Sequence, residues 1–166
     1  CFEFAAAGRI PYTGRLGILS AEDKKQIQNA LELVGAAHLA NRDFNCVSDG
    51  QRQRILLARA VCQQPQVLLL DEPLSNLDAR LRLQTREEIV KIQKRTGITT
   101  LFVTHDQEEA MSISDRIVVM RNGLLMQQGA PQQVYDDPQN LFVAKFLGTP
   151  PINVFEGEVK GGVLQL

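Results

Sequence analysis

The chain of 166 residues lacks the features that define several classes of protein. Its three cysteines, Cys1, Cys46 and Cys62, show no C-x-x-C spacing, which argues against a disulfide framework or a zinc site and favours reduced thiols of a cytosolic protein. No apolar run approaches the roughly 18 residues of a membrane helix, and no basic-then-apolar signal pattern is found at the start. A membrane role is therefore expected only through partners.

A strong charge of either sign is also missing. The chain has 18 basic and 19 acidic residues and a formal net charge of −1, which does not favour a nucleic-acid-binding module. The hydrophobic share of 44% is ordinary for a globular protein, and the length allows one domain with a real core. Because the first residue is Cys and not Met, we expect the chain to be a fragment.

One stretch organises the rest of the sequence. Residues 67–70 form a continuous apolar run that ends in Asp71 and Glu72, and Pro73 follows. This pattern is typical of a strand buried on both faces of a parallel sheet, and open α/β sheets bind ligands at the carboxyl ends of such strands. One carboxylate there could hold magnesium and a second could orient or deprotonate a water. Two acids in a solvated turn would fit this stretch alone equally well.

A second stretch, residues 48–51, forms a Ser-Asp-Gly-Gln turn that opens a predicted helix reaching about residue 63. Its first turn carries free backbone N–H groups and a glycine that permits close approach, which suits an anion such as phosphate. Ordinary N-capping by Ser48 or Asp49 is the simpler interpretation. The arginines that follow are expected to be solvated or paired rather than phosphate ligands: Arg52, Arg54 and Arg59.

A long charged helix over residues 79–96, closed by Gly97, precedes a second apolar strand over residues 98–104. That strand delivers His105 to its carboxyl end, the same kind of position that the two acids occupy. Asp106 and Glu109 form a capping pair for the next helix.

The remaining elements follow from local signals. Ser20 and Asp23 resemble a capping box before a helix that Gly35 can close, and His38 is expected to be a half-buried helix residue and not a ligand. The other predicted elements are an Asn-Gly hairpin over 116–128, a short helix from Pro131, a helix over 141–147 capped by Asn140, and a hairpin over 154–166 around Gly161-Gly162.

Taken in order, these motifs resemble those of the nucleotide-binding subunits of ATP-binding-cassette (ABC) transporters. Residues 47–51 resemble the signature motif, and residues 67–71 resemble the Walker B strand followed by a catalytic glutamate. Residues 75–78, Ser-Asn-Leu-Asp, match the D-loop, and His105 matches the switch histidine. Each motif is weak alone, but their order and their strand or helix contexts make the combination specific.

The resemblance implies roles for these residues. Asp71 would hold Mg²⁺ against the phosphates of ATP, Glu72 would polarise the attacking water, and His105 would contact the γ-phosphate. Two subunits of this family sandwich two ATP molecules head to tail, and the closing and opening of the pair drive transmembrane permease subunits. The residues implied to reach the partner's nucleotide or the dimer interface are Ser48, Asp49, Gly50, Gln51 and Asp78.

Two departures from the family pattern stand out. Val47 and Asp49 replace the usual Leu and Gly of the signature, and an acidic residue there occurs in some importer subfamilies. The phosphate loop, G-x-x-x-x-G-K-[ST], is absent, because no Lys in the chain follows a Gly. The glutamine loop is missing as well. We therefore expect the chain to begin inside the helical subdomain and to be inactive as an ATPase by itself.

The two halves resemble different importers. Residues up to about 64 are similar to importers of ferric siderophores or cobalamin, and residues from 74 onward are similar to importers of sugars and glycerol phosphate. The join would fall within the Walker B stretch that both groups share, which suggests a hybrid.

The sequence thus predicts an α/β fold that contains part of a RecA-like P-loop NTPase core with a parallel sheet and flanking helices. The expected domains are a helical subdomain with the signature motif (1–64), the C-terminal half of the ATPase core (65–147), and a linker with the first strands of a regulatory β-domain (148–166).

The expected function is that of the ATP-hydrolysing subunit of an ABC importer, peripheral on the cytoplasmic face of the plasma membrane. ATP and Mg²⁺ are the expected cofactors. A second nucleotide-binding subunit and permease subunits are the expected partners, without nucleic acid. One alternative is a non-catalytic fragment that only pairs with an intact subunit. Another is a DNA-repair or chromosome-maintenance ATPase, which would carry long coiled-coil heptads that this chain lacks.

Overall fold

The computed structural model describes residues 1–148, 150–155, 157–160 and 163–165. These residues form a mixed α/β fold with a parallel strand pair and flanking helices, which confirms the predicted fold class. The chain divides into two compact units, Cys1–His105 and Asp106–Leu166. None of the helices in the described ranges is long and apolar enough to cross a membrane.

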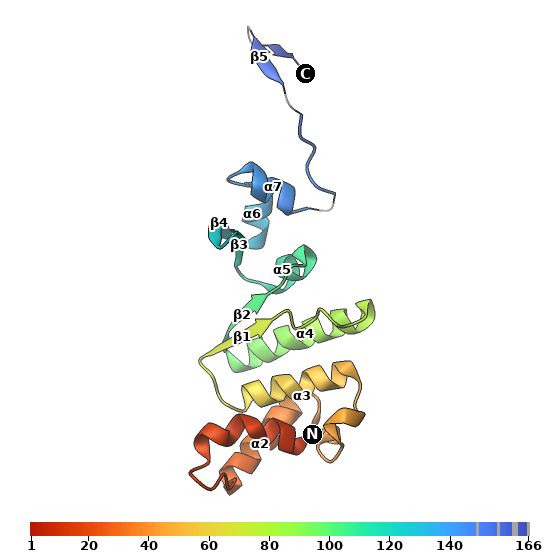
Figure 1. Ribbon diagram of the computed structural model, residues 1–166, viewed down its shortest axis with the longest axis vertical. Helices are drawn as coiled ribbons and strands as arrows, with labels where there is room; N and C mark the ends of the chain where they lie inside the picture. The colour runs from red at the N-terminus through yellow and green to blue at the C-terminus, as the bar shows by residue number, and fades with distance from the viewer. Residues whose placement is uncertain (149, 156, 161–162, 166) are drawn as a thin grey trace. The chain divides into compact units, whose positions relative to one another are not determined.

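Helices form the first part of the Cys1–His105 unit (Figure 1). These helices share a hydrophobic core that includes Ile27, Leu31 and Ile55, which are fully buried. The predicted capping box is confirmed, because Ser20 and Asp23 bond reciprocally. The elements are α1 (Phe2–Ala6), η1 (Ala7–Tyr12), α2 (Ala21–Leu33), η2 (Ala37–Leu39), η3 (Phe44–Cys46) and α3 (Asp49–Val61).

A buried ion pair holds the 3₁₀ helix η1 against α2. Arg9 points inward from η1 and donates to Asp23 Oδ1 at 2.9 Å and to the Cys62 carbonyl at 3.0 Å. Hydrogen bonds from Ser20, followed by the bond and charge of Arg9, lower the pKa of Asp23. His38 is exposed, so its predicted half-burial is wrong, because the short helix η2 turns it toward solvent.

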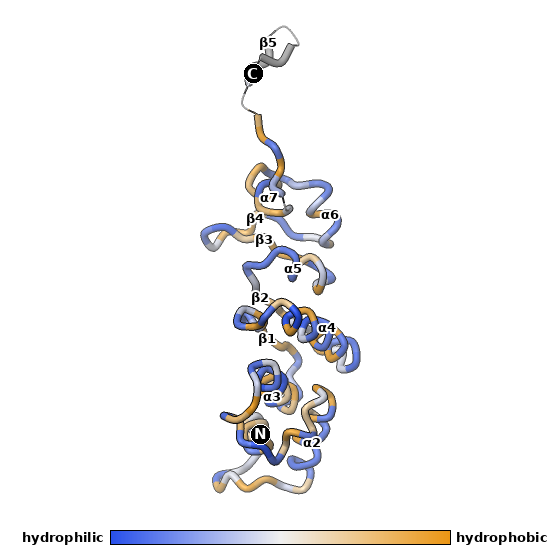
Figure 2. Tube along the Cα trace, turned by 90° about the vertical axis from the view of Figure 1, so that its right-hand side faces the viewer, coloured by the Kyte–Doolittle hydropathy of each residue, from blue (hydrophilic) through white to orange (hydrophobic). Residues whose placement is uncertain are grey.

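The parallel pair consists of β1 (Val67–Asp71) and β2 (Thr99–Val103), with Leu69 opposite Leu101 and Asp71 opposite Val103. α4 (Ala79–Thr96) connects them and ends at Gly97, whose φ of 67° is left-handed. α4 lies beside the strand pair, and α3 packs against α4 (Figure 1). Figure 2 shows hydrophobic and hydrophilic residues alternating along α4, whose buried positions are Thr85, Ile89 and Ile92.

The prediction that β1 is buried on both faces is wrong. Leu68 is only 7% exposed, but Val67 and Leu69 are each 60% exposed. Leu101 and Val103 of β2 are also exposed. Helices of the unit cover one face of the strand pair, and the face that carries these alternate residues is open.

The Asp106–Leu166 unit begins with α5 (Gln107–Ile113), which Asp106 caps by accepting from the Glu109 N–H at 3.1 Å. β3 (Ile117–Arg121) and β4 (Leu124–Gly129) form the predicted hairpin, and its turn residues Asn122 and Gly123 both have positive φ. α6 (Pro131–Asp136) and α7 (Leu141–Phe146) follow. The core of this unit is Ile117, Val119, Val134, Val143 and Leu147.

The last predicted hairpin is shorter than expected. β5 (Glu158–Lys160) pairs antiparallel with β6 (Val163–Gln165), so the pairing itself is confirmed. The predicted turn residues Gly161 and Gly162 lie outside the described residues.

Candidate functional site

The ends of β1 and β2 bring two predicted site residues together. Because the strands are parallel, Glu72 and His105 leave the sheet at the same edge, and the Glu72 N–H donates to the Val103 carbonyl at 2.9 Å. His105 Nδ1 lies 3.0 Å from Glu72 Oε1. When Glu72 is ionised its carboxylate only accepts hydrogen bonds, and Nδ1 is then the donor in this contact. The Glu72 side chain is 49% exposed and the His105 side chain is 74% exposed, which leaves both accessible to a ligand.

Glu72 has an unusual backbone. Its φ of 44° is left-handed, a conformation that costs a non-glycine residue about 1–3 kcal/mol. The Glu72 carbonyl accepts from the Ser75 N–H at 3.2 Å and from Ser75 Oγ at 2.9 Å. These bonds close a four-residue turn with Pro73 in its second position, where proline is favoured. Leu74 is fully buried and anchors the turn from within.

Asp71 is the last residue of β1 and is exposed. Among the described residues, no cluster of three or more His, Cys, Asp or Glu side chains has the arrangement of a protein-only metal site. Magnesium in phosphate-transfer sites is instead bound by one or two carboxylates together with substrate phosphates and water. The single carboxylate of Asp71, next to the Glu72–His105 pair, fits that chemistry.

The signature residues form the start of α3. The Gln51 N–H donates to Ser48 Oγ at 3.4 Å, and the Ser48 N–H donates to Gln51 Oε1 at 3.1 Å. Asp49 pairs with Arg52 at 3.1 Å on the surface. The structure therefore shows a capping box here, the simpler of the two interpretations of this stretch.

The start of α3 packs against the start of α4. Asp78 caps α4 by accepting from the Leu81 N–H at 2.9 Å. A Cβ placed on Gly50 would lie 2.5 Å from Leu81 Cδ1, so a side chain at this position would force Leu81 to move. Gly50 thus has a packing role that the sequence did not reveal, because nothing in the local pattern identifies Leu81 as its neighbour.

The structure separates the predicted site residues into two groups within this unit. Glu72 and His105 are in contact, with Asp71 adjacent in sequence. Ser48, Gly50 and Asp78 gather around the starts of α3 and α4. Within the described residues, the capping hydrogen bonds of Ser48 and Asp78 stay at the starts of α3 and α4. They do not reach Glu72 or His105.

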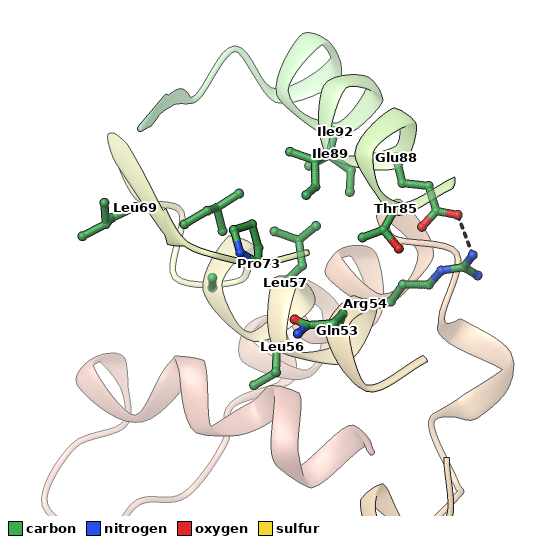
Figure 3. A pocket seen from close by; sticks show the side chains of 12 residues that line it. Gln53, Arg54, Leu56, Leu57, Leu69, Pro73, Thr85, Glu88, Ile89 and Ile92 are labelled. Atoms are coloured by element: carbon green, nitrogen blue, oxygen red, sulfur yellow. Dashed lines mark ion pairs between the residues drawn. The ribbon is translucent and has the colours of Figure 1, made fainter. Parts of the chain in front are cut away.

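Each of the three arginines after the signature contacts another side chain, and two of them, Arg52 and Arg54, form ion pairs. Arg54 Nη2 lies 2.6 Å from Glu88 Oε1, and Arg59 lies over the Phe4 ring at 5.4 Å. The pair of Arg54 and Glu88 stands beside a cavity of about 210 Å³ between α3, β1 and α4 (Figure 3). Its walls include Leu57, Ile89 and Ile92, and the predicted site residues are not among those that line it.

Comparisons with known proteins agree with this fold. The family described as "ABC transporter" matches residues 4–75. The trehalose/maltose import ATP-binding protein MalK of Thermococcus litoralis is 51% identical over 138 residues, 83% of this chain and 37% of that protein. The spermidine/putrescine import ATP-binding protein PotA of Vibrio vulnificus is 52% identical over 141 residues, 85% of this chain and 37% of that protein.

A solved structure of an ABC transporter component has a similar fold. CbiO1 from Clostridium perfringens, described as part of the ABC transporter complex cbiONQ, superposes with a TM-score of 0.70 and 30% identity. The match covers 80% of this chain and 51% of that one. The chain belongs to the ABC transporter ATP-binding family. It spans somewhat more than a third of the length of the curated relatives that it matches.

Proposed function

We propose that this chain is part of the ATP-hydrolysing subunit of an ABC importer. The carrying observation is the shared edge of β1 and β2, where Glu72 Oε1 and His105 Nδ1 lie 3.0 Å apart next to Asp71. The relatives are named as import ATP-binding proteins, for sugars in one case and for polyamines in another. The two match equally well, so substrate choice does not depend on the residues that they share with this chain.

Each residue at this edge has a task that suits phosphoryl transfer. Bound Mg²⁺ would neutralise charge on the phosphates of ATP, and Asp71 is the carboxylate that would hold it. Glu72 would orient the attacking water, with a free carboxylate oxygen as acceptor for its proton. His105 would contact the terminal phosphate. Positioning and charge stabilisation supply most of the catalysis in such reactions.

The second group of residues suits an interface. We propose that the start of α3 meets the nucleotide held by a second subunit, through Ser48, Asp49, Gly50 and Gln51, with Asp78 at the same interface. Permease subunits would place this protein at the inner face of the membrane, and CbiO1 is described as part of an ABC transporter complex. The proposed domains are residues 1–64, 65–147 and 148–166, as the motifs divide them.

The chain by itself is proposed to bind ATP weakly, because no Gly-Lys pair is available to form a phosphate loop. Titration of this polypeptide with ATP and Mg²⁺ should show no saturation in the micromolar range. Saturable micromolar binding would contradict this part of the proposal.

A chimera tests the catalytic roles directly. The homologous segment of the Thermococcus litoralis relative is replaced with this chain's segment, and steady-state ATP hydrolysis is measured. We expect activity, a loss of at least about 100-fold in Glu72→Gln and a large loss in His105→Ala. His38→Ala is the matched control at the chain's other, exposed histidine and should keep full activity. A chimera that stays active with Glu72→Gln would refute the assignment.

A further inference from the structure

We propose that Ser75 is a positioning residue for Glu72. Its hydroxyl holds the left-handed Glu72 backbone so that the Glu72 carboxylate meets His105. The functional meaning of this inference rests on the proposed role of Glu72 in orienting water. The geometry itself does not depend on any nucleotide.

The Glu72 backbone is held on both sides of its Cα. On one side its N–H donates to the Val103 carbonyl at 2.9 Å, which adds one more bond beyond the β1–β2 ladder. On the other side its carbonyl accepts two bonds from Ser75, from the N–H at 3.2 Å and from Oγ at 2.9 Å. The Ser75 side chain therefore acts on the peptide that sets the direction of the Glu72 side chain.

The left-handed φ has a clear geometric use. Successive residues of an extended strand point to opposite faces, so a simple continuation of β1 would direct Glu72 away from the side of Asp71. The turn at φ 44° breaks that alternation just beyond the strand. The carboxylate then reaches His105, which follows the neighbouring strand by two residues.

The Glu72–His105 contact cannot hold this conformation alone. Both side chains are largely exposed, and an exposed pair stabilises less than a left-handed non-glycine residue costs. The turn must supply the difference. Among the hydrogen bonds at Glu72 just described, only the bond from Ser75 Oγ comes from a side chain, so a substitution can remove it. The other bonds are made by backbone groups.

The test uses the full chain labelled with ¹⁵N and long-range ¹H–¹⁵N spectra, which report which ring nitrogen carries the proton. The chain has two histidines, so exposed His38 is an internal reference. We expect the neutral His105 ring to be protonated mainly at Nδ1. Ser75→Val should lower the ratio of Nδ1–H to Nε2–H by about three-fold, the effect of one lost hydrogen bond. Thr has nearly the same shape as Val but keeps the hydroxyl, so Ser75→Thr should retain the ratio of Nδ1–H to Nε2–H.

Asn76→Ala, an exposed neighbour in the same loop, should leave the ratio unchanged, and the amide spectra of α3 and α4 show that each variant is folded. Equal ratios in the Val and Thr variants, or an equal change in Asn76→Ala, would overturn the role of Ser75. The two proposals fail separately. An inactive chimera would refute the proposed function, but the ratio of Nδ1–H to Nε2–H in His105 would still change in Ser75→Val.

Discussion

The strained backbone of Glu72 leads to a quantitative prediction about stability. We compare Glu72→Gly with Glu72→Ala, because both remove the carboxylate and its contact with His105. They differ in the residue that must adopt φ 44°. A residue with a Cβ pays about 1–2 kcal/mol in the left-handed region, whereas glycine loses roughly 0.5–1 kcal/mol through its greater freedom in the unfolded chain. The difference of these two ranges makes the Gly variant more stable by about 0.7 kcal/mol, within a range of roughly 0–1.5 kcal/mol.

Urea unfolding followed by tyrosine fluorescence measures this difference. The chain has two tyrosines and no tryptophan, so a Tyr135→Phe background leaves Tyr12 as a reporter of the Cys1–His105 unit. The Tyr12 hydroxyl donates to the Gln63 carbonyl at 2.6 Å, so its environment changes when the unit unfolds. Equal slopes of free energy against urea in the two variants show that the midpoints can be compared.

The matched control is Asn29, an exposed residue inside α2. At this right-handed helical position the order should reverse, and Asn29→Gly should be less stable than Asn29→Ala by about 1 kcal/mol. If Glu72→Ala were as stable as Glu72→Gly while the Asn29 pair behaved as expected, Glu72 would not be left-handed in solution. Ser75 would then have no left-handed Glu72 backbone to hold.

Three further predictions concern other parts of the same unit. The lowered pKa of Asp23 stabilises the folded chain above the ordinary aspartate range, so unfolding free energy should fall as the pH drops below about 4, and Asp23→Asn should reduce this dependence in urea titrations. Exposed Cys46 should react with iodoacetamide much faster than Cys62, whose pKa is raised by burial, as mass spectrometry of timed samples would show. Gly50→Ala should destabilise by about 1–3 kcal/mol because of Leu81, and adding Leu81→Ala should recover part of the loss; equal stability of Gly50→Ala and the parent would contradict the contact.

Local signals account for what the sequence predicted well. The predicted capping residues Ser20, Ser48 and Asp106 each accept a hydrogen bond from a backbone N–H three residues later, so the residues that start a helix are visible in the sequence itself. Gly97 ends α4 for a similar reason, since its left-handed φ favours glycine. The strand ends were equally predictable, because Asp71 follows an apolar run directly and His105 follows one after a single threonine.

What the sequence could not give depends on residues far apart in the chain. The open face at Val67 and Leu69 depends on which elements cover β1, and an apolar run carries no information about its covering. The contact of Gly50 with Leu81 joins two helices, and Arg9 reaches Cys62 across the helical cluster. The role of Ser75 had a signal that was available: a proline directly after the acids favours a four-residue turn whose last residue bonds back to its first.

The contact between Glu72 and His105 also limits what the imidazole can do. A neutral imidazole has a single N–H, and the 3.0 Å contact at Nδ1 uses it. Nε2 is then an acceptor and repels a phosphate oxygen. His105 can donate to a phosphate only if the ring takes up a second proton or releases Glu72. A ring with two protons can donate to Glu72 and to the phosphate at the same time, whereas a neutral ring can donate to only one of them. For the neutral ring, contact with a phosphate therefore requires that His105 release the Glu72 carboxylate.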